Sequence, residues 1–224
     1  MGLKAENISR EFLRQGRDSN VFTALYPTDF TLESGKVTVV MGRSGSGKTT
    51  LLNICAGLLQ PTCGKVWIGD TDIYALDDAA LSKFRNEHIS VIVQSHSAIA
   101  SLTVLENVEL PLNLYHQNNP EKALELLEMM GIAELKDCMP NQLSGGELRR
   151  MAIARSLMTD PDILLADEPT GDLDDENTEI VFRLLKDVAQ KGTAVLLVTH
   201  ENTAVQYADV LYKMDAGKLT KITG

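Results

Sequence analysis

The sequence contains little cysteine, few aromatic residues and a deficit of positive charge. Aromatic residues make up 5% of the 224 positions, and the formal net charge is −10. Since nucleic-acid binders present a basic surface, we expect no nucleic-acid partner. The cysteines Cys55, Cys63 and Cys138 are odd in number and lack C-x-x-C spacing. We therefore expect ordinary thiols in a reducing compartment, and neither disulfides nor a zinc site.

Long apolar runs are also missing. The longest, such as Val37–Met41 and Ala194–Val198, have the length of a strand and fall far short of the roughly 18 residues of a membrane span. The first dozen residues are polar and lack the apolar core of a signal peptide. We expect a cytosolic chain folded as a single domain of residues 1–224, large enough for one substantial core.

Short apolar runs recur along the chain, and each ends in glycine or polar residues. They are Val37–Met41, Ser90–Val93, Ile163–Ala166 and Ala194–Val198, followed by Gly42, Gln94, Asp167–Glu168 and Thr199–His200. Runs without polar alternation are typical of strands buried on both faces of a parallel sheet. Since ligands bind beyond the carboxyl ends of such strands, these end residues are expected to gather at one edge.

The sequence between the second and third runs has helical signals. Thr103 and Glu106 have the spacing of a capping box, Asn119–Pro120 fits a helix start, and Gly131 fits a helix end. The sequence therefore predicts an α/β core of about residues 1–94 and 161–224, with a helical subdomain of about residues 95–160 inserted into it. Residues 14–20 are expected to form an exposed loop.

The stretch GRSGSGKT, Gly42–Thr49, fits the phosphate-loop pattern G-x-x-x-x-G-K-[ST] in full and lies between an expected strand and helix. In such a loop, backbone amides surround phosphate oxygens, Lys48 neutralises the β- and γ-phosphates, and the Thr49 hydroxyl ligates Mg²⁺. The predicted nucleotide contacts here are Gly42, Arg43, Ser44, Gly45, Ser46, Gly47, Lys48, Thr49 and Thr50.

Two carboxylates follow the third apolar run. Asp167 stands where phosphate-loop enzymes hold the magnesium shell, at the end of a buried strand. Glu168 comes directly after it and would lie beside the γ-phosphate, where it could orient or deprotonate a water molecule.

The stretch QLSGGELRR, Gln142–Arg150, predicts a helix start suited to an anion. Ser144 and Glu147 have capping-box spacing, but Gly145 and Gly146 occupy the first turn, where each costs about 1 kcal/mol relative to alanine. Glycines at a helix start leave backbone N–H groups open to a phosphate. An ordinary capped helix is the alternative interpretation.

Together these motifs resemble those of the ATP-binding subunits of ABC transporters, from Phe12 to His200. Leu143–Glu147 matches the signature of that family, and Gly171–Asp174 matches the loop that crosses its dimer interface. Gln94 matches the glutamine that touches the metal–water site. His200 matches the switch histidine that contacts the γ-phosphate.

The resemblance implies a phosphate-loop fold with a mainly parallel sheet, an N-terminal antiparallel β portion and an inserted helical subdomain. It implies ATP and Mg²⁺ as cofactors and a homodimer, in which each ATP lies between the phosphate loop of one copy and the signature helix of the other. The implied catalytic residues are Glu168, His200, Gln94 and Lys48. The implied metal site consists of Thr49, Gln94 and Asp167, and the facing copy supplies Ser144, Gly145, Gly146 and Asp174.

The motifs are most similar to the lipoprotein-release, macrolide-export and cell-division branch. That similarity implies a transport-coupled ATPase at the inner face of the cell membrane, working with a separate integral-membrane permease in export or mechanical coupling. The permease would dock near residues 94–102. A soluble ABC-type ATPase of DNA repair or translation is the alternative, although such chains carry coiled coils or two ATPase halves, which this sequence lacks.

Several positions leave alternatives open or depart from the family pattern. Phe12 is the candidate for stacking on adenine, with Phe22 and Tyr26 as alternatives. Glu147 replaces a more usual Gln, which is harmless only if its carboxylate points back into its own helix cap. Pro27 predicts an edge or a break in the strand before the phosphate loop. Arg149 and Arg150 are expected on a solvated face or in interface ion pairs.

Overall fold

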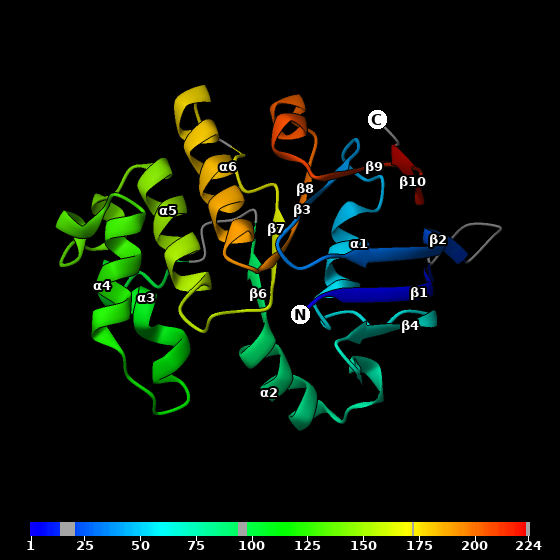
Figure 1. Cartoon of the computed structure of the whole chain (residues 1–224), viewed down its shortest axis with the longest axis horizontal. Helices are drawn as coiled ribbons and strands as arrows, with labels where there is room; N and C mark the ends of the chain where they lie inside the picture. Colours follow the sequence, from blue (N-terminus) through cyan, green and yellow to red (C-terminus); the bar gives the residue numbers. More distant parts are fainter. Residues whose placement is uncertain (14–20, 94–97, 172, 223–224) are drawn as a thin grey trace.

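The structure, a computed structural model, describes residues 1–13, 21–93, 98–171 and 173–222 (Figure 1). The predictions for Gln94 and for the loop of residues 14–20 lie outside these ranges. Within the described ranges, no helix is both long enough and apolar enough to cross a membrane.

A six-stranded sheet forms the centre of the molecule, in the order β10-β9-β3-β8-β7-β6 (Figure 1). Neighbours run parallel except β9 and β10. The strands are β3 (Val37–Met41), β6 (Ile89–Ile92), β7 (Ile163–Asp167), β8 (Ala194–Thr199), β9 (Val210–Asp215) and β10 (Lys218–Ile222). The predicted parallel sheet is thus confirmed. Met41 pairs with Thr199 and Asp167 with Val198, so these three strands end at one edge.

A second, four-stranded antiparallel sheet has the order β2-β1-β4-β5. Its strands are β1 (Leu3–Leu13), β2 (Val21–Leu32), β4 (Cys63–Ile68) and β5 (Thr71–Asp72). The structure places Pro27 in β2 and not, as predicted, in the strand that leads to the phosphate loop. The expectation of an edge strand is correct, since β2 ends the sheet and an edge position tolerates the missing N–H.

The helices cover both faces of the central sheet. They are α1 (Lys48–Cys55), α2 (Asp78–His88), α3 (Val104–Asn113), α4 (Pro120–Met129), α5 (Gly145–Ser156) and α6 (Asp175–Gln190). Short 3₁₀ turns occupy Ile73–Ala75, Ala133–Leu135, Pro140–Gln142 and Asn202–Tyr207. The predicted capping box of Thr103 and Glu106 is confirmed, as is the cap at Asn119. Gly131, with a φ of +65°, follows the end of α4.

Successive residues of each central strand face different cores. In β8, Leu196 belongs to a core shared with α1 and the antiparallel sheet, and Leu197 belongs to a core shared with α6 and α3–α5. Both side chains are almost fully buried. Because both faces are covered, the strands need apolar residues at nearly every position, which explains the absence of alternation in the sequence.

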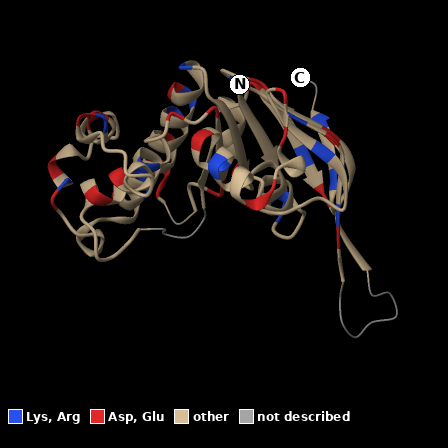
Figure 2. Cartoon of the chain, turned by 90° about the horizontal axis from the view of Figure 1, so that it is seen from below, with Lys and Arg blue, Asp and Glu red and all other residues tan. Residues whose placement is uncertain are grey.

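Helices α3, α4 and α5 follow β6 in the chain and precede β7. Seen from below, this group lies to one side of the sheets and contains many Asp and Glu residues (Figure 2). The fully buried Asn107 exchanges hydrogen bonds with the backbone of Ile99 and donates to the carbonyls of Leu102 and Thr103. This side chain fixes the turn before α3. The subdomain boundaries at about residues 95 and 160 remain a prediction.

Candidate functional site

The phosphate loop lies between β3 and α1, at the edge where the parallel strands end (Figure 1). Its residue Gly47, directly before α1, adopts a φ of +109°, and a Cβ on it would lie 2.5 Å from the Ala24 carbonyl oxygen. Only glycine fits both constraints, since other residues avoid positive φ and cannot approach a backbone so closely. The sequence pattern therefore encodes a real requirement of the loop.

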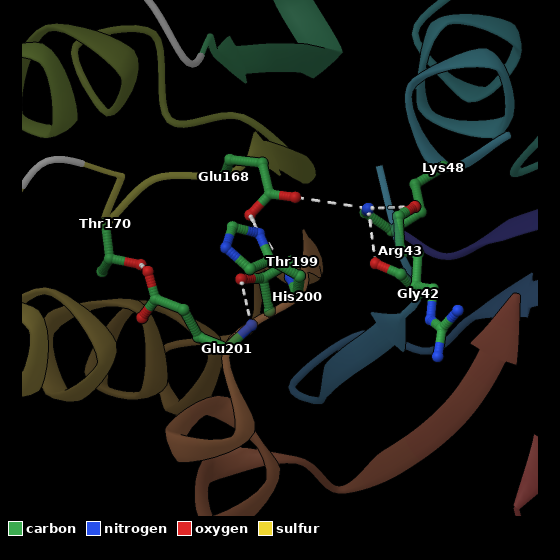
Figure 3. A network of polar contacts seen from close by, with 8 residues as sticks. All are labelled: Gly42, Arg43, Lys48, Glu168, Thr170, Thr199, His200 and Glu201. Carbon is green, nitrogen blue, oxygen red and sulfur yellow. Dashed lines mark hydrogen bonds and ion pairs between the residues drawn. The ribbon is translucent and has the colours of Figure 1, made fainter. Parts of the chain in front are cut away.

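Lys48 lies buried inside this loop. Its ammonium group donates hydrogen bonds to the carbonyl oxygens of Gly42, at 2.8 Å, and Arg43, at 3.2 Å. It also pairs with Glu168, its Nζ lying 3.3 Å from Oε1 of that carboxylate (Figure 3). The loop thus curls around a positive charge that could meet phosphate oxygens.

Glu168 and His200 face each other across the ends of β7 and β8 (Figure 3). Oε2 of Glu168 lies 2.9 Å from Nδ1 of His200 and accepts a hydrogen bond from the His200 backbone N–H at 3.3 Å. Burial raises the pKa of the Glu168 carboxyl, but hydrogen bonds from His200 and the charge of Lys48 outweigh burial and hold the pKa below its usual value. Glu168 is therefore a carboxylate at neutral pH.

Thr170 and Glu201 extend this network on the side away from Lys48 (Figure 3). The buried Thr170 hydroxyl donates to Oε1 of Glu201 at 2.8 Å, and the Glu201 backbone N–H donates to the Thr199 hydroxyl at 3.1 Å. These bonds brace the turn that carries His200. The sequence patterns do not single out Thr170 or Glu201, whose only signal is their closeness to Glu168 and His200 along the chain.

Asp167 ends β7 as a buried carboxylate. Burial raises the pKa of Asp167 above its usual value, although a hydrogen bond from Thr49 opposes the shift. Its Oδ1 atom is buried and has no hydrogen-bond partner in the described part of the chain. An unsatisfied buried oxygen beside a hydroxyl suits a small divalent cation.

The chain supplies few side-chain ligands for such a cation. Among the described residues, no group of three or more His, Cys, Asp or Glu side chains could hold a metal ion. A cation beside Asp167 and Thr49 would therefore take most of its oxygen ligands from phosphates and water, as Mg²⁺ in nucleotide sites does.

A pocket of about 360 Å³ opens beside the phosphate loop. Its lining combines loop residues, two strand-end residues and aromatic residues of the antiparallel sheet: Phe12, Phe22, Ala24, Ser44, Gly45, Gly47, Lys48, Thr49, Thr50, Glu168 and His200. Phe12 and Phe22 pair across β1 and β2. Tyr26, the third aromatic considered for adenine, does not line this pocket and instead has Lys218 over its ring.

The remaining loop residues lie close by. Gly42 and Arg43 line a neighbouring pocket that also contains His200. Ser46 is buried, and its hydroxyl has no hydrogen-bond partner within the described ranges. The structure therefore gathers the phosphate loop, Asp167, Glu168 and His200 in one place.

The signature helix α5 has the predicted capping box. The Glu147 backbone N–H donates to the Ser144 hydroxyl, and the Ser144 backbone N–H donates to the Glu147 carboxylate at 2.7 Å. These hydrogen bonds lower the pKa of Glu147. The negative charge therefore points back into its own helix cap and leaves the helix end free to attract an anion.

The two glycines of the signature have different surroundings. Gly145 is exposed, with its nearest neighbour for an added Cβ at 3.9 Å, on Leu173. Gly146 is buried, and an added Cβ would overlap the side chain of Asn177 on α6. Packing thus accounts for the glycine at position 146. At position 145, the remaining explanation is that a glycine leaves its backbone N–H group accessible to a ligand.

The signature residues and Asp174 lie outside the pocket beside the phosphate loop. None of Ser144, Gly145, Gly146 or Asp174 lines it. The structure thus separates the two phosphate-seeking segments of the sequence.

The expectation for Arg149 on a solvated face is wrong. Its side chain is 4% exposed and donates a hydrogen bond of 2.7 Å to the Val93 carbonyl at the end of β6. Arg150 donates to Asn177 of α6 at 3.1 Å. Both arginines hold α5 against neighbouring elements within the chain.

This fold and site define a phosphate-loop nucleotide-binding protein with an ATPase constellation at the strand ends. Residues 25–171 match the family model described as "ABC transporter", and the chain belongs to this family. The predicted fold class and the resemblance given by the sequence motifs are confirmed.

Curated relatives fall in the branch that the sequence indicates. The lipoprotein-releasing system ATP-binding protein LolD of Treponema denticola is 41% identical, over 87% of this chain and 88% of its own. LolD of Chromohalobacter salexigens is 38% identical, over 98% and 93%. A macrolide export ATP-binding/permease protein MacB of Yersinia pestis is 37% identical over 97% of this chain, which spans only 32% of that relative's length.

Solved structures of ATP-binding cassettes match the whole chain. A dimeric post-hydrolysis state of the cassette MJ0796 with ADP and Pi has a TM-score of 0.87, 35% identity and 99% coverage of both chains. A second dimeric structure of the same cassette has a TM-score of 0.88.

Asp167→Asn should stabilise the chain in the absence of nucleotide and metal. The pKa of Asp167 is raised above 3.8 in the folded protein, so its ionised form opposes folding at neutral pH. This destabilisation disappears as the pH falls through the pKa that Asp167 has in the folded protein, because the carboxyl then becomes neutral. Urea denaturation should therefore give a higher midpoint for the variant at pH 7, with a difference that shrinks towards pH 4.

The exposed Asp70 provides the control, because Asp70→Asn should leave the midpoint unchanged. A midpoint for Asp167→Asn at or below that of the unmodified chain at pH 7 would show that Asp167 is not a strained, unsatisfied charge.

Proposed function

We propose that this chain is the ATP-hydrolysing subunit of an ABC transporter and energises a separate membrane permease. The observation that carries the proposal is the position of Glu168, held 3.3 Å from Lys48 and 2.9 Å from His200 beside the phosphate loop. A charged carboxylate fixed at that point can accept a proton from water that attacks a γ-phosphate.

The pocket lining suggests how the chain would bind ATP. The phosphate-loop amides and Lys48 would bind the phosphates, and adenine would stack on Phe12 or Phe22. Lys48 would exchange part of its pairing with Glu168 for phosphate oxygens. That exchange would release the Glu168 carboxylate towards water, with His200 Nδ1 still orienting it.

The Asp167 and Thr49 side chains would hold Mg²⁺, with Gln94 as the third predicted contact. When bound, the cation would neutralise charge on the β- and γ-phosphates. The support for this proposal is the Asp167 carboxylate, which is hydrogen-bonded to Thr49 and whose buried Oδ1 atom has no hydrogen-bond partner among the described residues.

The working unit would be a homodimer with two equivalent composite sites. In each site, Ser144, Gly145 and Gly146 of one copy would complete the phosphate contacts of the other copy, with Asp174 at the interface. Two observations support this: these residues lie outside the pocket of their own chain, and the similar cassette MJ0796 has been solved as a dimer in two structures.

The permease would be an integral-membrane partner at the cytoplasmic face of the cell membrane, in a system of the exporting or mechanically coupled kind. The similarity to lipoprotein-releasing and macrolide-export proteins supports this branch. Residues 1–224 would act as one ATPase domain. Residues 94–102 remain the proposed docking segment, of which Ile99 is 39% exposed.

Glu168→Gln should reduce ATP turnover by about 10² or more while leaving ATP binding intact, because the amide cannot accept the proton from water. The variant should also accumulate as a dimer when ATP is added. Phosphate release and analytical ultracentrifugation measure the two effects, with Glu128→Gln on the exposed face of α4 as the control. Turnover equal to that of the unmodified chain would remove Glu168 from the chemistry.

Mixing two inactive variants should restore activity. Lys48→Ala damages the phosphate loop and Ser144→Arg damages the signature, so a mixed pair keeps one intact composite site. In an equal mixture that exchanges freely, about a quarter of the unmodified rate is expected, since half of the pairs are mixed and each has one working site of two. A mixture as inactive as either variant alone would contradict the shared site.

The permease can be sought directly. Affinity purification of the tagged full-length chain from detergent-solubilised membranes of its own cells should retain an integral-membrane protein in fixed stoichiometry. ATP turnover should rise when that protein is present, because the two activities are coupled. Recovery with nucleic acid, or turnover indifferent to the membrane protein, would count against a transport role.

A further inference from the structure

We infer that Asn177 is a positioning residue that locks the signature helix α5 to the start of α6, so that Gly145 and Asp174 meet a second copy as one rigid surface. The inference rests on the proposed homodimer and adds a residue that holds its interface in shape. In the chain, α5 and α6 are separated by β7, and in space they lie side by side (Figure 1).

On the α6 side, the Asn177 side chain is bound to Asp174, which caps the helix. The Asn177 backbone N–H donates to Asp174 Oδ1 at 2.8 Å, and the side-chain amide donates to both carboxylate oxygens, at 2.9 and 3.1 Å. The first of these bonds is an ordinary helix cap. The additional bonds from the amide fix the orientation of an exposed carboxylate that the cap alone would hold through a single oxygen.

On the α5 side, the same amide group accepts a hydrogen bond. Arg150 donates to Asn177 Oδ1 at 3.1 Å. Gly146 lies directly against this side chain, because a Cβ on Gly146 would overlap both Asn177 Oδ1 and its amide carbon. Asn177 thus occupies space that any other residue at position 146 would need, and it holds α5 at that close distance.

Position 177 requires a side chain that both donates and accepts hydrogen bonds, as an amide does. Asparagine donates to a carboxylate and accepts from a guanidinium at the same time. An aspartate at position 177 would accept from Arg150 but repel Asp174, and an apolar side chain would do neither. Arg150, Asn177 and Asp174 therefore form a continuous chain of polar contacts from one helix to the next.

The residues that this contact positions are exposed. Ser144, Gly145 and Asp174 lie at the surface, and Leu173 approaches the position of a Gly145 Cβ to within 3.9 Å. A facing copy would need to meet the helix end and the Asp174 carboxylate together. Fixing their relative position before association reduces the conformational entropy that the dimer must lose.

The test separates dimer formation from nucleotide binding. In the Glu168→Gln background, Asn177→Ala should raise the dimer dissociation constant in saturating Mg-ATP about tenfold. The affinity of the monomer for a fluorescent ATP analogue should change less than about twofold, since Asn177 does not line the nucleotide pocket. A purely structural role would lower both affinities together.

Two further variants complete the design. Arg150→Met removes the hydrogen bond to Asn177 from the α5 side and should also raise the dimer dissociation constant. The variant with both Asn177→Ala and Arg150→Met should have a dissociation constant no higher than that of the weaker-binding single variant. Glu179→Ala, which removes an exposed ion pair of α6, should change neither quantity. Thermal unfolding confirms that each variant is folded, and Arg150→Met carries the test should Asn177→Ala fail to fold.

The outcomes distinguish this inference from the proposed function. A dimer of Asn177→Ala as tight as that of the Glu168→Gln parent, or additive effects of Asn177→Ala and Arg150→Met, would overturn the inference and leave the proposed function standing. Failure of the parent to dimerise with ATP at any concentration would overturn both.

Discussion

The register between β3, β8 and β7 is the constraint on which the site depends. Backbone hydrogen bonds from Gly42 to Thr199 and from Glu168 to Val198 continue this register past the strand ends. They bring the phosphate loop, the carboxylate and His200 to one edge. Glu168 adopts a φ of +46° there, a conformation that is unfavourable for a residue with a side chain. The paired strands and the bonds to Lys48 and His200 hold it in place.

Much of this arrangement could be predicted because the relevant constraints are local. The apolar runs specify strands, the caps at Thr103, Asn119 and Ser144 specify helix starts, and the glycines of the phosphate loop specify one backbone shape. The location of Pro27 was mispredicted, because its place depends on which sheet β2 joins. The burial of Arg149 was mispredicted for the same kind of reason, since its partner Val93, directly after β6, is distant in sequence.

Other features lie beyond any local pattern. Thr170 meets Glu201, and Asn177 meets Arg150, only because the fold brings these residues together. For Thr170 and Glu201, closeness to Glu168 and His200 along the chain is the only signal in the sequence. Gly146 shows the opposite case. Its contact with a phosphate remains a prediction, whereas the structure supplies a second reason for a glycine at position 146, the packing against Asn177.

The chain therefore keeps its two predicted phosphate-binding segments apart. The phosphate loop, Asp167, Glu168 and His200 form one cluster, whereas the end of α5 and Asp174 face outward elsewhere. Glu147 keeps its charge within its own cap, so the positive end of α5 remains available. The proposed facing copy and the proposed positioning role of Asn177 both rest on this separation.

A structure of the Glu168→Gln chain with Mg-ATP tests the central claim most directly. If each nucleotide pocket is shared, the γ-phosphate on one copy will lie within hydrogen-bonding distance of the Gly145 or Gly146 amide of a second copy. A closed, ATP-bound assembly in which both glycines are remote from every triphosphate would contradict it.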